Sequence, residues 1–248
     1  MANRELPSQL LLDFPLNPVF SYGNLIVGEG NRQACQALRD LNLLPGELLT
    51  LVGEEGTGKT HLLQATVRQW RLQAGEEGVA VYLDMDLLSA HLTETGGSGE
   101  QVLSDLMNRY AACRLVALDD LQELENHAAL QEGVLFLFRH LRERQGRLVC
   151  ASRRSPLQLV LRPDLGSRLS LGLVVPVLPP GDEERAEILR KMAIDRQVRV
   201  GEELLRFLAA RLPRRVADYA QAIDHLDQEG LRQQRPWTIP LAKEVLGL

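Results

Sequence analysis

Short apolar runs alternate with amphipathic segments along the first two thirds of the chain. A short run of buried-type residues bounded by glycine or by charge is typical of a strand covered on both faces. Five runs of this kind are predicted as strands, at residues 47–53, 79–84, 114–120, 147–152 and 173–178. Pro176 places the fifth strand at a sheet edge or at a strand end, because proline donates no ladder hydrogen bond.

The segments between these strands carry apolar residues at helical spacing. Residues 60–73 show this spacing and are followed by Gly75, a typical helix stop. Residues 134–144 show it between the third and fourth strands. Buried strands separated by helices predict an α/β fold of three layers, with a parallel sheet between two layers of helices.

The pattern changes at Pro179-Pro180-Gly181, after which only helical segments follow. These helices are predicted at residues 182–196, 201–212, 214–231 and from 238 onwards. The change predicts a small all-helical domain over residues 179–248, after an α/β domain over residues 21–178. Residues 1–20 are polar, interrupted by prolines and without helical periodicity, so we expect a mobile tail there.

Composition excludes several classes of protein. The chain has 248 residues, of which 45% are hydrophobic, and no apolar run long enough to span a bilayer, so no membrane partner is expected. The net charge of -5 argues against a broad surface for nucleic acid. The N-terminus shows no signal-peptide pattern, and three widely spaced cysteines suit a reducing compartment. We therefore expect a cytoplasmic protein.

Residues 53–60, GEEGTGKT, match the phosphate-loop pattern G-x-x-x-x-G-K-[ST] and follow a predicted strand. Such a loop turns its N–H groups around a phosphate, and the helix behind it adds positive potential. Lys59 would contact the β- and γ-phosphates, and the Thr60 hydroxyl would bind Mg²⁺. The glycines of the motif are Gly53, Gly56 and Gly58. The alternative is a glycine-rich turn with an incidental lysine.

A second candidate element is the apolar strand that ends in two acidic residues, LVALDD. Asp119 is predicted on the metal side, and Asp120 is predicted to polarise or position the attacking water. The alternative is a strand that ends in an ordinary acidic turn. His61, directly after the phosphate loop, is expected beside the nucleotide as a packing residue rather than as a catalytic base.

Three segments, LIVGEGNRQA, GTGKTHLLQA and LVALDDLQEL, make the chain from about Phe20 onwards resemble the ATPase core of the bacterial replication initiator DnaA, in the AAA+ superfamily. The resemblance implies a P-loop α/β domain followed by a helical lid, with ADP or ATP and Mg²⁺ as cofactors. It also implies that the nucleotide base lies near Leu25 and Val27, with Asn31 close by. A core segment is the other interpretation of residues 25–28.

The segment DLGSRLSLG, residues 164–172, is similar to the part of this family that carries an arginine finger. Arg168 would then contact the γ-phosphate of a nucleotide held by a neighbouring molecule, where charge spreads in the transition state. The resemblance implies either DnaA or a second copy of this chain, through the AAA+ interface, as that neighbour. The alternative is a surface arginine in a loop.

The chain departs from the initiator pattern in the parts that read DNA. No helix-turn-helix domain follows the lid, so recognition of duplex DNA is not expected. Between residues 85 and 113, Arg109 is the only lysine or arginine, whereas a groove for single-stranded DNA needs clustered positive charge. Contact with DNA is therefore expected only indirectly, through a partner.

The chain also departs at the two sensor positions. Arg153 and Arg154 stand where the family has an acidic residue before an arginine, and Ala217 stands where the lid arginine is expected. Arg215, and beside it Arg214, is a candidate replacement next to the nucleotide. Whether any of these arginines restores the sensors is open, and we expect an activator of another ATPase more than an efficient ATPase.

The tail contains QLLLDF, which fits the loose pattern Q-L-x-L-x-[LF] that bacterial replication proteins present to the DNA polymerase sliding clamp, its β subunit. Gln9 would hydrogen-bond at the rim of a groove, while Leu10, Leu12 and Phe14 would fill apolar subsites. The alternative is that these side chains dock on the chain's own domain.

The combined features resemble regulators of this family that switch off DnaA after replication begins. The expected function is a nucleotide-bound adaptor that docks on the clamp and stimulates hydrolysis of ATP held by DnaA, preventing re-initiation. Two alternatives are an autonomous AAA+ ATPase that loads or remodels a helicase, and a DnaA-like protein that binds single-stranded DNA.

Overall fold

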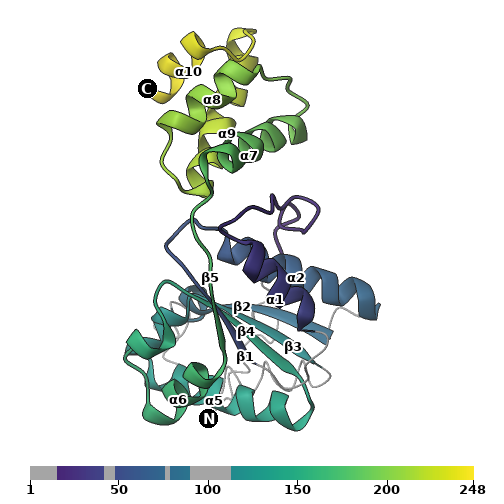
Figure 1. Ribbon diagram of the computed structural model, residues 1–248, viewed down its shortest axis with the longest axis vertical. Coiled ribbons are helices and arrows are strands. Elements are labelled where there is room, and N and C mark those ends of the chain that lie inside the picture. The colour runs from purple at the N-terminus through teal and green to yellow at the C-terminus, as the bar shows by residue number, and fades with distance from the viewer. Residues whose placement is uncertain (1–15, 42–47, 76–78, 90–112) are drawn as a thin grey trace, which may run out of the picture.

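The computed structural model describes residues 16–41, 48–75, 79–89 and 113–248. Five parallel strands form one sheet in the order β2-β3-β4-β1-β5, with helices on both of its faces (Figure 1). The strands are β1 (Leu48–Val52), β2 (Ala80–Asp84), β3 (Leu115–Asp119), β4 (Arg147–Ser152) and β5 (Leu173–Pro176). The predicted α/β fold with a parallel sheet is confirmed, and β5 lies at the sheet edge with Pro176 as its last residue.

The helices divide between the two faces of the sheet and a separate lid. The sheet domain carries α1 (Arg32–Asp40), α2 (Lys59–Ala74), α5 (Ala128–Glu143), α6 (Pro163–Leu171) and the 3₁₀ turns η2 (Leu121–Asn126) and η3 (Pro156–Gln158). The lid consists of α7 (Asp182–Asp195), α8 (Glu202–Arg211), α9 (Val216–Gln233) and α10 (Ile239–Leu246). The predicted helical lid is confirmed, whereas α5 begins before the predicted residue 134.

Alternation along each strand divides the apolar residues between two cores. Leu49 and Leu51 of β1 pack with α1 and α2, whereas Leu48 packs with α5 and α6 on the opposite face. The lid has its own core around Leu208, Tyr219 and other buried residues of its four helices. Because β1 to β4 are buried almost along their whole length, whereas the edge strand β5 is partly exposed, the central strands form a rigid platform that fixes the loops at the carboxyl edge.

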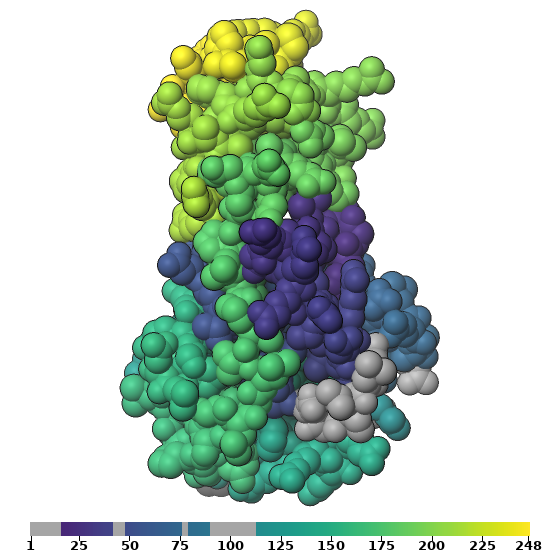
Figure 2. All heavy atoms as spheres, viewed as in Figure 1, coloured from purple at the N-terminus to yellow at the C-terminus, as the bar shows by residue number. Residues whose placement is uncertain are grey.

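The lid lies beyond the carboxyl edge of the sheet, on the same side as the N-terminal segment from residue 16 to α1 (Figure 1). In the space-filling view the purple N-terminal segment is in contact with the green start of the lid (Figure 2). Leu178 donates its N–H to Gly30 O at 2.9 Å, which joins the connection into the lid to this segment. Three separate stretches of sequence therefore bound the carboxyl edge: the N-terminal segment, the connection into the lid, and the lid itself.

Three further observations bear on the predictions made from composition and from the tail. No helix among the described residues has the length and apolarity needed to cross a bilayer. Cys35, Cys113 and Cys150 are buried and unpaired. The predicted tail motif, with Gln9, Leu10, Leu12 and Phe14, lies outside the described residues, as does Arg109.

Candidate nucleotide-binding site

The predicted phosphate loop runs from the end of β1 to the start of α2, at the carboxyl edge of the sheet. Gly53 donates its N–H to Ser152 O at 3.1 Å, and a Cβ at Gly53 would lie only 2.1 Å from Val177 O. Gly58 has φ +96° and caps the N-terminus of α2. Two glycines of the motif are therefore required by the local backbone, which presents the helix N-terminus to an anion.

Lys59 is held within the loop rather than extended into solvent. Its side chain is only 7% exposed, and its Nζ donates to Gly53 O at 2.8 Å and to Glu54 O at 2.7 Å. Burial lowers the pKa of Lys59, while the nearby carboxylates of Asp119 and Asp120 act in the opposite direction. The ammonium lies where a phosphate bound by the loop would neutralise it.

Asp119 ends β3 in a buried position beside α2. Its carboxylate accepts hydrogen bonds from the Tyr82 hydroxyl at 3.0 Å, from the N–H of Asp120 at 3.0 Å, and from the Thr60 side chain. Burial raises the pKa of Asp119, and these donors lower it. A carboxylate beside a threonine hydroxyl is an oxygen donor set of the kind that Mg²⁺ prefers, so the residues fit a metal beside the phosphate loop.

Asp120 has an unusual backbone conformation. Its φ and ψ are +54° and +52°, in the left-handed region that non-glycine residues seldom occupy. Its Oδ1 accepts a hydrogen bond of 2.7 Å from the Gln122 amide. A strained residue persists only where its surroundings hold it, and such residues cluster at functional sites. The fold therefore holds the Asp120 carboxylate in a position of its own, separate from that of the Asp119 carboxylate.

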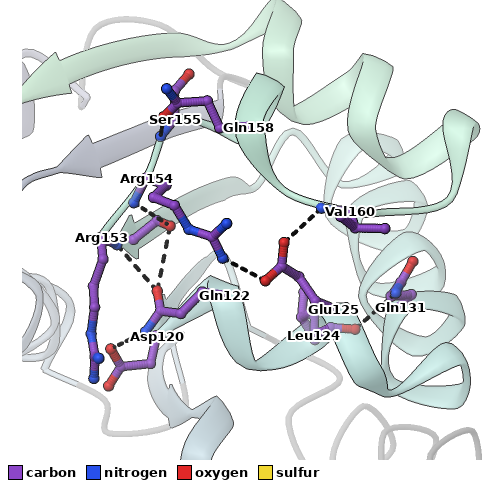
Figure 3. A network of polar contacts seen from close by, with 11 residues as sticks. Asp120, Gln122, Leu124, Glu125, Gln131, Arg153, Arg154, Ser155, Gln158 and Val160 are labelled. Carbon is purple, nitrogen blue, oxygen red and sulfur yellow. Dashed lines mark hydrogen bonds and ion pairs between the residues drawn. The ribbon is translucent and has the colours of Figure 1, made fainter.

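Gln122 joins this carboxylate to the end of β4 (Figure 3). Its Oε1 accepts hydrogen bonds from the N–H of Arg153 at 3.1 Å and from the Ser152 hydroxyl at 3.4 Å. The positive charge of Arg153 is close enough to lower the pKa of Lys59, whereas Arg154 points away and pairs with Glu125. Of the two arginines at the first sensor position, Arg153 is the one beside the phosphate loop.

The lid contacts the phosphate loop through the N-terminus of α9. Val216 donates its N–H to Gly56 O at 3.0 Å, and a Cβ on Gly56 would lie 2.5 Å from the Cβ of Arg215. The Arg215 guanidinium pairs with Asp218 at 2.9 Å and with Glu55 at 3.5 Å. Arg215 is therefore next to the loop, but its charge is already compensated by carboxylates.

The segment predicted near the nucleotide base lies between the sheet domain and the lid. Leu25 packs against the core on the α2 face, whereas the Val27 side chain is 44% exposed. The Asn31 side chain accepts from the N–H of Gly28 at 2.9 Å and donates to Ile26 O at 2.9 Å, which closes the segment into a turn. Val27 is thus the apolar side chain that remains accessible there.

A lid carboxylate holds the same turn. Glu184 accepts hydrogen bonds from the N–H of Glu29 at 2.6 Å and from the N–H of Gly181 at 2.9 Å. A Cβ at Gly28 would lie 1.8 Å from the Glu184 Oε1, so only glycine allows this approach. Glu184 therefore caps its own helix and fastens the lid to the N-terminal segment at once.

His61 faces the N-terminal segment. Its Nε2 is 2.9 Å from Ser21 O, and its ring stacks on Phe20 with the ring centroids 4.9 Å apart. Burial lowers the pKa of His61, which favours the neutral ring with the proton on Nε2. These contacts are those of a packing residue that seats the N-terminal segment on α2.

Arg168 lies in the last turn of α6, and its Nη1 donates to Asp164 O at 2.6 Å. Helix α6 ends beside the start of β1, because a Cβ at Gly172 would lie 2.7 Å from Leu48 side-chain and backbone atoms. The phosphate loop starts after Val52, at the other end of this strand. Five strand residues span about 16 Å at 3.3 Å per residue, so the end of α6 is far from the chain's own phosphate loop.

The structure thus brings together most of the residues predicted for the chain's own nucleotide, whereas Arg168, predicted for a neighbour's nucleotide, lies apart from them. The phosphate loop, Asp119, Asp120 and the backbone of Arg215 meet at the carboxyl edge, while Arg168 is carried by α6. Sequence inspection missed Gln122, Ser152, Tyr82, Gln64 and Glu184. A tyrosine inside the buried run of β2 was one available signal, because a buried hydroxyl needs a hydrogen-bond partner.

Comparison with known proteins agrees with this architecture. Residues 16–176 match the family model described as the bacterial DnaA ATPase domain, and residues 182–246 match the model described as the Hda lid domain. The chromosomal replication initiator protein DnaA of Microcystis aeruginosa is 30% identical over 222 residues, 88% of this chain and 49% of that protein. The chain spans about half the length of the curated relatives it matches.

Solved structures of DnaA share the fold. Domain III of Thermotoga maritima DnaA superposes with a TM-score of 0.83 at 27% identity, covering 94% of this chain and 98% of that one. The AMPPCP-bound DnaA from Aquifex aeolicus superposes with a TM-score of 0.72 at 27% identity, covering 89% of this chain and 68% of that one. The chain therefore belongs to the bacterial DnaA ATPase-domain family, and its lid is of the Hda type.

Proposed function

We propose that this protein is a regulator of replication initiation that holds a nucleotide of its own and stimulates hydrolysis of ATP bound to DnaA. It docks on the sliding clamp through Gln9 to Phe14 and presents Arg168 to the nucleotide of DnaA. Hydrolysis converts DnaA to its ADP form and prevents re-initiation. The observation that carries the proposal is the separation of Arg168 from the chain's own phosphate loop, which leaves it available to a neighbour's nucleotide.

The bound nucleotide would be ADP or ATP, held by the loop from Gly53 to Thr60. The AMPPCP complex of a relative supports an adenine nucleotide. Asp119 and Thr60 would hold Mg²⁺, which would neutralise phosphate charge. Leu25 and Val27 would line the site of the base, and Arg215 would flank the phosphates from the lid.

The test of the finger uses Arg168→Ala with Arg162→Ala as its matched control. Arg162 precedes the other end of the same helix, and its half-exposed guanidinium pairs with Glu132 at 3.5 Å and with Asp164 at 3.4 Å, while its backbone N–H, which the alanine variant keeps, donates to Gln131. Hydrolysis of ATP preloaded on DnaA is followed in the presence of DNA-loaded clamp. We expect Arg168→Ala to reduce the stimulation on the order of 10³-fold and Arg162→Ala to leave it intact. Equal stimulation by both variants would exclude the finger assignment.

Docking on the clamp is tested separately by a pull-down. Immobilised clamp should retain the wild-type chain and lose the double variant Gln9→Ala/Leu10→Ala, because both a rim hydrogen bond and an apolar anchor are removed. The control is Pro7→Ala, just outside the motif. Equal recovery of all three chains would remove the clamp from the proposal and leave the finger assignment standing.

A second candidate function, an autonomous ATPase, is favoured by one observation. Asp120 is held in a strained conformation beside the phosphate loop, as a group that polarises water would be. Turnover of ATP by the purified chain alone, abolished in Asp120→Asn, would support this candidate. Turnover that does not respond to that substitution would exclude Asp120 as its catalytic group.

A further inference from the structure

A relay of three buried polar side chains, Gln64, Tyr82 and Asp119, runs beneath the phosphate loop and is not explained by the fold alone. Gln64 of α2, Tyr82 of β2 and Asp119 of β3 are 6%, 4% and 2% exposed. They come from three separate elements and lie on the α2 side of the sheet. Polar groups this deeply buried need hydrogen-bond partners within the protein, because they have little access to water.

The hydrogen bonds of this relay all point the same way, from donor to acceptor, from Asn17 at one end towards Asp119 at the other. The Tyr82 hydroxyl donates to Asp119 Oδ2 at 3.0 Å. The Gln64 side chain hydrogen-bonds Tyr82, and because the Tyr82 hydroxyl proton is already donated to Asp119, the Gln64 amide group donates to the phenol oxygen. The Gln64 Oε1 in turn accepts the N–H of Asn17 at 2.7 Å. Each donor is thereby matched to an acceptor from Asn17 to the carboxylate.

The outer end of this relay is a well-seated part of the N-terminal segment. Arg68 of α2 donates to Asn17 O at 3.1 Å, and the Asn17 Oδ1 accepts the N–H of Val19 at 3.0 Å. Further along, the Tyr22 and Thr66 hydroxyls are 2.8 Å apart. The segment is thus attached along one side of α2, and Asn17 is the point at which it reaches Gln64.

The inner end determines how Asp119 is oriented. With Tyr82 on Oδ2 and the N–H of Asp120 on Oδ1, neither oxygen can rotate without losing a hydrogen bond. Partners that orient a ligating carboxylate are typically worth about 10- to 100-fold in metal affinity. The hydroxyl of Tyr82 is not needed for packing, because a phenylalanine ring at this position would fill nearly the same volume.

We propose that Tyr82 and Gln64 are positioning residues that orient the Asp119 carboxylate for Mg²⁺, and that Asn17 holds the outer end of this relay. The inference rests on the proposed nucleotide site, in which Asp119 contacts the metal. It assigns to the N-terminal segment a part in the metal-dependent portion of nucleotide affinity.

The experiment compares ADP affinity with and without Mg²⁺, by calorimetry on the full chain. The measured quantity is the Mg²⁺ enhancement, the ratio of the two affinities. Asp119→Asn tests the metal site itself and should abolish the enhancement. If Asp119→Asn keeps the wild-type enhancement, both the metal site and the relay are excluded.

Tyr82→Phe tests the relay. It should lower the Mg²⁺ enhancement about 10-fold while leaving the affinity in EDTA within about twofold. Gln64→Met, which keeps the volume and removes the hydrogen bonds, should lower it in the same direction. A wild-type enhancement in Tyr82→Phe, with Asp119→Asn defective, would overturn the relay and leave the metal site intact. A merely destabilised variant would instead lose affinity equally with and without Mg²⁺.

The outer end is tested with a matched pair at one position. Asn17→Pro removes the backbone donor to Gln64, whereas Asn17→Ala keeps it and removes only the side chain. The enhancement should fall in Asn17→Pro relative to Asn17→Ala. Equal enhancement in this pair would show that the relay ends at Gln64 and would overturn the role given to Asn17.

Discussion

Charged side chains at the carboxyl edge of the sheet and on helix α6 differ in how much of each is buried and in how many partners hold it. At the carboxyl edge, Lys59 and Asp119 are nearly inaccessible, and backbone or side-chain partners hold each of them. On α6, the half-buried Arg168 donates a hydrogen bond to a backbone carbonyl of its own helix and forms no ion pair within the described part of the chain. The first arrangement suits a ligand enclosed by the chain, and the second suits a group offered to another molecule.

The surroundings of the two regions differ in the same way. The phosphate loop lies under the lid, where Val216 and Glu184 fasten the lid to the sheet domain. The end of α6 is flanked by Leu171, which is 87% exposed, and the preceding η3 segment carries Leu157, which is 80% exposed. A patch of exposed leucines is typical of a surface that a partner covers. Substitutions in the two regions should therefore have separable effects.

Among the substitutions compared by their ADP affinity, the largest effect is expected from Lys59→Ala in the phosphate loop. Removal of the ammonium should weaken ADP binding about 100-fold, since loss of one partner of a buried charge pair costs 2–5 kcal/mol. The control is Lys191→Ala, whose half-buried side chain lies on the lid helix α7 and pairs with Asp195 at 3.7 Å. Calorimetry measures both variants, and similar affinities would contradict the role of the loop.

A smaller effect is expected from Gly56→Ala, with Gly75→Ala as its control. Both glycines have positive φ, +77° and +71°, so each substitution should cost about 1–2 kcal/mol of stability. Only the Cβ at residue 56 would meet the lid, at Arg215, whereas the space around Gly75 is open. We expect Gly56→Ala alone to weaken ADP binding, by about 10-fold. Equal ADP affinity in the two variants would show that the lid contact does not affect the site.

The smallest effect is expected from Glu184→Ala, which removes the fastening between α7 and the N-terminal turn. Loss of a helix cap costs about 1 kcal/mol, so the melting temperature should fall by a few degrees and ADP affinity by a few-fold. Glu183→Ala, in the same first turn but exposed, is the control. A fall of equal size in Glu183→Ala would assign the effect to the helix dipole rather than to the fastening.

The elements that sequence patterns predicted are those whose signal is local. The strand before the phosphate loop is followed by a glycine that its neighbours require, because a Cβ at Gly53 would meet Val177 O. The apolar run that ends at Asp119 and the helix that starts at Lys59 follow from the same short-range signals. Helix α5 began earlier than predicted, because Ala128 to Gly133 contains too few apolar residues to show a period.

The contacts that sequence patterns could not predict join residues that are far apart in the chain. The bond from Val216 N to Gly56 O and the contact of Glu184 with Glu29 depend on how the lid closes on the sheet domain. Gln64, Tyr82 and Asp119 meet only because β2 lies beside β3 under α2. A polar residue within a buried pattern signals that a partner exists but does not identify it.

The separation of the two regions is tested most directly by the ADP affinity of Arg168→Ala. If Arg168 serves only a neighbour's nucleotide, calorimetry should give the wild-type dissociation constant, with and without Mg²⁺, in a variant that no longer stimulates DnaA. A clear loss of ADP affinity in Arg168→Ala would show that the arginine serves the chain's own site, and would contradict the account.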